Sequence, residues 1–228
     1  MAGQIHSITQ MGILELLKAG GVVMLPLLIC SLAVWAVIFE RLWRYRRLGA
    51  DLKSFHLEAI NAMLRADRGT LRSLFEKYPE LPTADLLKTA MDRLEAGDVR
   101  LRANWREALE RRRKLLNQEL RSHLWILGTV ASAAPFIGLF GTVVGILRSF
   151  GDMAQTGQGG FATVAGGISE ALVATATGIL VAVVAVLAYN TFQTRWSQLV
   201  LLIRLHTEEF AEALEEGRLG RASEVEGE

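Results

Sequence analysis

The sequence predicts an all-α integral membrane protein with three membrane-spanning helices. Hydrophobic residues make up 51% of its 228 residues, and they gather in long runs that carry no charge. Water-soluble domains seldom contain such runs, and about 20 apolar residues suffice for a helix to cross the hydrocarbon core of a bilayer. The backbone of a spanning segment must satisfy its own hydrogen bonds in lipid, so we expect these runs to be helices.

The first span is expected at residues 20–40. Residues 1–17 contain no Lys or Arg, and the apolar run begins only afterwards, so the N-terminus lacks the basic start of a cleavable signal peptide. Residues 1–19 are instead expected to form an amphipathic arm at the periplasmic membrane surface. A cluster of arginines follows the span directly: Arg41, Arg44, Arg46 and Arg47.

Residues 41–123 are predicted to form a cytoplasmic helical region. Basic clusters lie at both of its ends, and spans with positively charged flanks place those flanks in the cytoplasm. Leu52, Phe55 and Ala59 form an apolar stripe at helical spacing. From Asp98 to Leu127 the helical pattern meets no Gly or Pro. This pattern predicts one long helix that joins the region to the second span, residues 124–147.

The remaining chain is predicted to return across the membrane. The polar, glycine-rich segment 148–160 is expected to be a periplasmic turn. The third span follows at 161–190, and its helix is expected to continue into the cytoplasm. Residues 191–228 would then hold the rest of that helix and a disordered acidic tail. The N-terminus is therefore expected in the periplasm and the C-terminus in the cytoplasm.

Small residues line one face of the second and third spans. Gly138, Gly141 and Gly145 recur at helical spacing in the second span, and Ala174 and Gly178 do so in the third. Small side chains let helix backbones approach closely in lipid, where the hydrophobic effect does not drive helices together. The pattern predicts tight helix packing and association with further copies of the chain.

Glu170 is the only charged residue between Phe161 and Thr194. A charge at the bilayer centre costs about 2.5–3.5 kcal/mol, so we expect Glu170 to face a bundle interior or a wet cavity and to exchange a proton there. Thr177 lies on the same helical face, and Thr142 lies beside the glycines of the second span. Two plainer interpretations stay open. In the first, Glu170 is a neutral carboxyl group with a structural role only. In the second, each threonine hydroxyl donates to a carbonyl of its own helix.

Two stretches resemble a known family. "APFIGLFGTVVGILRSF" (134–150) and "GGISEALVATATGILVAVVAVLAYNTF" (166–192) strongly resemble the ExbB/TolQ/MotA proton-channel family, and in particular its ExbB/TolQ branch. The resemblance implies a subunit of a motor in the bacterial inner membrane. It implies a homopentamer that surrounds the single spans of two ExbD/TolR-like chains. Proton flow there would drive mechanical work on a TonB- or Tol-type envelope system, through a TonB- or TolA-like protein.

The resemblance also assigns residues. The glutamate of the family's third span corresponds to Glu170, and its pore threonines correspond to Thr142 and Thr175. The expected proton carrier on the partner is a membrane aspartate. The helical wheel alone favours Thr177, but we follow the resemblance for Thr175 and keep Thr177 as the second candidate. Protons are the expected transported ion, and no cofactor or metal is expected.

Two other membrane functions would use the same residues. A structural membrane scaffold would use Glu170 only for assembly, and a flagellar or gliding stator subunit would use the same chemistry for motility. An enzyme is not expected, because the four histidines are scattered and no nucleophile motif or phosphate-binding loop appears. The net charge of +1 gives no basic signature for nucleic acid, and a single cysteine excludes a disulfide framework within the chain.

Overall fold

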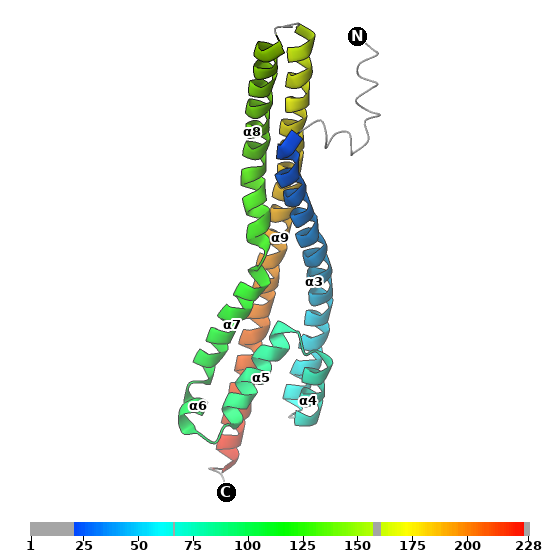
Figure 1. Cartoon of the computed structure of the whole chain (residues 1–228). Helices are drawn as coiled ribbons and strands as arrows, with labels where there is room; N and C mark the ends of the chain where they lie inside the picture. The colour runs from blue at the N-terminus through cyan, green and yellow to red at the C-terminus, as the bar shows by residue number, and fades with distance from the viewer. Residues whose placement is uncertain (1–20, 66, 157–160, 226–228) are drawn as a thin grey trace. The chain divides into compact units, whose positions relative to one another are not determined.

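The chain forms two compact units of helices. The computed structural model describes residues 21–65, 67–156 and 161–225. Residues 21–40 and 123–192 form one unit, which we call the apolar unit. Residues 41–122 and 193–225 form the other, which we call the polar unit. Every secondary-structure element among the described residues is a helix (Figure 1). The predicted arm, residues 1–19, lies outside the described residues.

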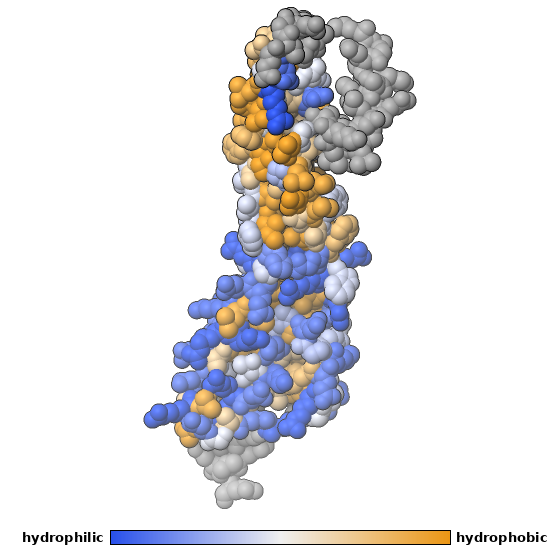
Figure 2. Space-filling model, viewed as in Figure 1, coloured by the Kyte–Doolittle hydropathy of each residue, from blue (hydrophilic) through white to orange (hydrophobic). Residues whose placement is uncertain are grey.

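The apolar unit contains the three predicted spans. It holds the 3-10 helix η1 (Gly21–Val23), the first part of α3 (Met24–Leu64), α8 (Leu124–Thr156) and the first part of α9 (Phe161–Val225). Three helical stretches are long and apolar enough to cross a membrane, with mean hydropathies of 2.7, 2.0 and 2.5. Figure 2 shows hydrophobic residues gathered over this unit and hydrophilic residues over the polar unit. The prediction of an all-helical fold with three candidate spans is therefore confirmed.

The helix predicted from Asp98 to Leu127 is interrupted, so the helix of the second span begins at Leu124 and is not continuous with the cytoplasmic helices before it. Asn104 separates α6 (Val99–Ala103) from α7 (Trp105–Arg121), and His123 has a left-handed φ of 64° before α8 begins. At the second break, the carbonyl oxygen of Leu120 accepts hydrogen bonds from Arg41 (3.0 Å) and Tyr45 (2.9 Å). Side chains of α3 thus satisfy the end of α7, and no local Gly or Pro marks the break.

Two further boundaries differ from the prediction. α8 continues to Thr156, so most of the segment predicted as a turn is helical, and residues 157–160 lie outside the described residues. α9 continues to Val225, into the tail for which disorder was expected. Neither stretch contains proline, and one glycine costs a helix only about 1 kcal/mol, so an established helix propagates through each.

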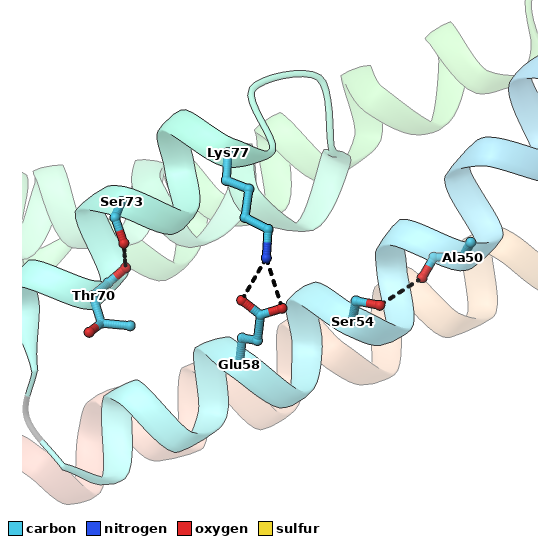
Figure 3. A network of polar contacts seen from close by, with 6 residues as sticks. All are labelled: Ala50, Ser54, Glu58, Thr70, Ser73 and Lys77. Carbon is cyan, nitrogen blue, oxygen red and sulfur yellow. Dashed lines mark hydrogen bonds and ion pairs between the residues drawn. The ribbon is translucent and has the colours of Figure 1, made fainter.

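The polar unit packs short helices against the ends of α3 and α9. It also contains α4 (Arg68–Lys77), α5 (Pro82–Glu95), α6 and α7. The stripe predicted on α3 is buried, since Leu52, Phe55 and Ala59 are all 0% exposed. The ring of Phe55 packs edge-on against Phe210 of α9, with centroids 6.1 Å apart. At the surface, Lys77 of α4 pairs with both carboxylate oxygens of Glu58 on α3, each at 3.1 Å (Figure 3).

Candidate functional site

Two glycines bring the backbones of α8 and α9 into contact. A Cβ added at Gly138 would lie 2.9 Å from the carbonyl oxygen of Ala174 and 2.9 Å from Cα of Thr175. A Cβ added at Gly178 would lie 2.6 Å from the carbonyl oxygen of Ala134. Carbon atoms do not approach backbone this closely, so only glycine fits at either position at the present helix separation.

The contact continues along the hairpin through small residues. A Cβ at Gly141 would lie 2.8 Å from the Cβ of Ala174, and one at Gly145 would lie 2.5 Å from the Cβ of Ala171. Gly167 also belongs to this contact and faces Ser149 of α8, although no sequence prediction includes it. The sequence feature that could have indicated Gly167 is the repeat of small residues on α9, because Gly167 lies one helical turn before Ala171.

Thr175 joins the two helices by a hydrogen bond. Its hydroxyl donates to the backbone carbonyl oxygen of Gly138, at 2.9 Å. The bond is possible because Gly138 has no side chain between its own carbonyl and α9. The structure therefore brings together one predicted pore threonine and one predicted packing glycine.

The other two candidate threonines bond within their own helices. The Thr142 hydroxyl donates to the carbonyl oxygen of Leu139 at 2.7 Å, and the Thr177 hydroxyl donates to that of Val173 at 2.8 Å. Both contacts match the plainer interpretation of a threonine in a membrane helix, whose hydroxyl is satisfied locally. Each hydroxyl keeps lone pairs with which it can accept a second hydrogen bond.

Glu170 lies on a flank of α9 beside the hairpin contact. At 100° per residue, it lies about 70° from the centre of the stripe formed by Gly167, Ala171, Ala174 and Gly178. Its side chain is exposed, and it makes no hydrogen bond or ion pair with any residue that the structure describes. Its neighbours three and four residues away on the helix, Gly166, Gly167, Val173 and Ala174, carry no polar side chain.

The chain thus presents a carboxylate on the outside of a close-packed apolar hairpin. In a membrane, a single copy would leave this group facing hydrocarbon, where a charge costs about 2.5–3.5 kcal/mol. Such residues normally face other helices or water inside a bundle. The arrangement is therefore suited to a site that a second chain completes.

Comparison with known proteins yields one family. The model of the MotA/TolQ/ExbB proton channel family matches residues 79–204. The chain is 33% identical over 177 residues to the biopolymer transport protein ExbB of Salmonella typhimurium, which covers 75% of this chain and 71% of the relative. It is 32% identical over 195 residues to the ExbB-like protein 3 of Synechocystis, with 83% and 89% covered. It is 49% identical over 83 residues to the Tol-Pal system protein TolQ of Pseudomonas aeruginosa, with 36% of each covered.

The family match covers more than half of the chain and includes the helices of the hairpin. Relatives bearing both the ExbB and the TolQ name match it. Together with its three apolar helices, this likeness makes the chain a multi-pass membrane protein. It belongs to the MotA/TolQ/ExbB proton channel family, in the ExbB/TolQ branch.

Proposed function

We propose that this chain is a proton-channel subunit of an inner-membrane motor. The observation that carries the proposal is Glu170, the one charged residue of the third span, exposed beside a close-packed helix pair. A carboxyl group is one of the few side chains that can take up and release a proton within a membrane. Each proton that crosses the membrane yields about 2.3 kcal/mol per 100 mV, so a few protons can power a mechanical step.

The same residue argues for partners. The uncovered carboxylate is stabilised if copies of the chain surround a lumen, and we propose the pentamer that the family resemblance implies. The lumen would hold an ExbD/TolR-like pair of single spans whose aspartate exchanges protons beside Glu170. Thr175, with Thr142 and Thr177, would line the path. A TonB- or TolA-like protein would receive the work, with the N-terminus in the periplasm and the C-terminus in the cytoplasm.

The proposal is tested in cells that lack the chromosomal copy and carry Glu170→Gln, which removes the titrating group but keeps its size. Ser169→Ala is the matched control, because Ser169 is the adjacent exposed polar residue of the same span. We expect the Gln variant to assemble normally and to lose energised envelope function, while the Ala control keeps both. Normal function of a normally assembled Gln variant would overturn the proton role.

The scaffold alternative gives a different pattern in the same strains. If Glu170 serves assembly alone, native mass spectrometry of the Gln variant will find the oligomer lost, with no transport defect beyond that loss. In the motility alternative the chain has the same chemistry but belongs to a flagellar or gliding motor. It is tested by the neighbouring genes, since TonB-like, Tol–Pal or gliding genes beside this one identify the machine.

A further inference from the structure

Arginines collect at one end of the polar unit, where α3 leaves its apolar stretch. Trp43, Arg44, Arg46 and Arg47 are all exposed on α3, and Trp43 is 70% exposed. Arg41 and Tyr45 of the same stretch point the opposite way and are buried. The residues of this stretch therefore lie on two opposite faces of α3. Two residues anchor the fold through the end of α7, and four face outward.

Contacts within the polar unit bring α7 and α9 to the same place. Arg41 and Tyr45 bind the Leu120 carbonyl at the end of α7. Arg121, the next residue, stacks over the ring of Trp196 on α9, with its guanidinium carbon 5.3 Å from the ring centroid. We define the collar as six exposed residues at this end: Trp43, Arg44, Arg46, Arg47, Arg121 and Arg195.

The collar contains little negative charge of its own. Of the three segments that supply the collar, residues 41–50 and 193–206 include no Asp or Glu, and residues 115–123 include one, Glu119. Arg47 has one weak acidic contact, with Asp51 at 3.8 Å, and its guanidinium also lies over Trp43 at 5.9 Å. Arg44, Arg46, Arg121 and Arg195 make no ion pair among the residues that the structure describes. Elsewhere in the same unit, exposed arginines pair with carboxylates, as Arg106 does with Glu215 at 2.6 Å.

Chain continuity fixes the depth of the collar. Arg44 and Arg47 follow Phe39, the last apolar residue of the span, by five and eight residues of an unbroken helix. At 1.5 Å per residue these distances are about 7.5 and 12 Å, which places Arg44 at the outer edge of the headgroup region, about 5–8 Å thick, and Arg47 one turn beyond it. Exposed tryptophan also favours the boundary between hydrocarbon and water.

We propose that the collar binds the phosphate groups of anionic phospholipids in the leaflet that it meets. Guanidinium groups bind phosphate oxygens in a bidentate manner, and an arginine over an aromatic ring keeps its edge free for that contact. The occupant is the lipid surface and not a free anion, because a tryptophan exposed between arginines fits the acyl–headgroup boundary. Lipid binding at the collar requires only that the chain spans a membrane, and it does not depend on the role of Glu170.

The test uses the full chain, purified and reconstituted in nanodiscs of phosphatidylcholine with about one-third phosphatidylglycerol. Lipids that stay bound are counted by native mass spectrometry. We expect the wild type to enrich phosphatidylglycerol over its share of the bilayer. The triple variant Arg44→Gln, Arg46→Gln, Arg47→Gln should lower that enrichment at least about tenfold, since each arginine contributes about fivefold at a membrane surface.

A matched control removes the same charge elsewhere. Arg72, Arg100 and Arg102 are exposed residues of the polar unit far along the chain from either span boundary. Their triple Gln variant should retain the wild-type enrichment. Equal loss in both triple variants, or retained enrichment in the collar variant, would overturn the proposal. Inorganic phosphate that competes the lipid away at millimolar concentration would also overturn it, by making the collar a free-anion site. Circular dichroism in pure phosphatidylcholine checks that each variant is folded.

Discussion

The hydroxyl of Thr175 donates a hydrogen bond to the backbone carbonyl of Gly138, 2.9 Å away on the neighbouring helix. A backbone carbonyl that already accepts a bond within its own helix can accept a second, and here it does so across α8 and α9. The contact needs a hydroxyl at one position and a missing side chain at the other. It therefore ties the polar residues of the third span to the packing of the hairpin.

Removing this hydroxyl should loosen the hairpin. We expect Thr175→Val to lower the free energy of unfolding by about 0.6–1.7 kcal/mol, the range of hydrogen bonds between membrane helices. Thr177→Val is the matched control, because the Thr177 hydroxyl bonds within its own helix and its loss should cost less. Thermal unfolding of the purified chain in detergent, followed by tryptophan fluorescence, measures both. Equal destabilisation of the two variants would contradict a bridging role for Thr175.

Glycine at the helix contact should tolerate no side chain. Gly178→Ala places a Cβ 2.6 Å from the Ala134 carbonyl oxygen, and we expect a loss of about 1–3 kcal/mol from overpacking. Gly166→Ala, in the same helix, meets no atom within 4 Å. Alanine has the higher helix propensity, so this control should be neutral or more stable by up to about 1 kcal/mol. A stable Gly178→Ala protein would show that the two helices lie further apart.

Arg41 should stabilise the end of α7. Its side chain is fully buried and donates to the Leu120 carbonyl and, at 3.0 Å, to the Ser122 hydroxyl. Arg41→Met keeps the bulk but leaves these acceptors with fewer donors, and we expect a loss of about 1.5–3 kcal/mol. Tyr45→Phe removes a single donor to a carbonyl that keeps Arg41, and should cost about 1 kcal/mol.

Hydrogen exchange locates this effect. Amides in the last turn of α7 should exchange faster in Arg41→Met than in Tyr45→Phe, while those of α4 stay unchanged. If exchange at the end of α7 is the same in the wild type and in Arg41→Met, the side chain does not cap the helix.

The polar unit should lose stability at mildly acidic pH. His206 is buried and stacks on His56, with ring centroids 3.7 Å apart, while His56 contacts Glu209 at 2.8 Å. Burial, followed by repulsion from His56, lowers the pKa of His206 from 6.5 to about 4, against a smaller opposing effect of Glu209. Between pH 6.5 and pH 4, His206 is protonated in the unfolded chain but stays neutral in the folded chain. Stability is therefore complete above pH 6.5 and falls as the pH drops toward 4.

The difference between the unfolded and folded pKa of His206 corresponds to roughly 3 kcal/mol of unfolding free energy. Thermal midpoints of the full chain in detergent, measured from pH 7.5 to 4, should fall more steeply for the wild type than for His206→Phe. His123→Gln serves as control, since His123 is exposed and outside the stack. Parallel pH profiles for the wild type and His206→Phe would contradict the assignment.

The spans were predictable because lipid imposes simple rules. Length, charge-free composition and helical spacing suffice to predict α3, α8 and α9, and small residues at repeated spacing indicate the hairpin contact. These signals are local, so each can be read from a short stretch of sequence. The buried stripe on α3 follows from the same reasoning, since its apolar residues recur with the period of the helix.

What escaped prediction depends on contacts between distant residues. The break at His123 has no Gly or Pro to signal it, and it rests on Arg41 and Tyr45, about eighty residues earlier in the chain. The helical wheel favoured Thr177 as the pore threonine, because a wheel considers the faces of one helix alone. The bond from Thr175 to Gly138 becomes visible only when two helices are placed together.

The most direct test of the proposed proton path is flux through the complex that co-purifies with a tag on this chain. The complex is reconstituted in liposomes containing a pH-sensitive dye, and an inside-negative potassium diffusion potential is applied. We expect proton entry with the wild type and with Ser169→Ala, and entry at the rate of empty liposomes with Glu170→Gln of equal protein content. Proton entry at the wild-type rate through the Glu170→Gln complex would contradict the account.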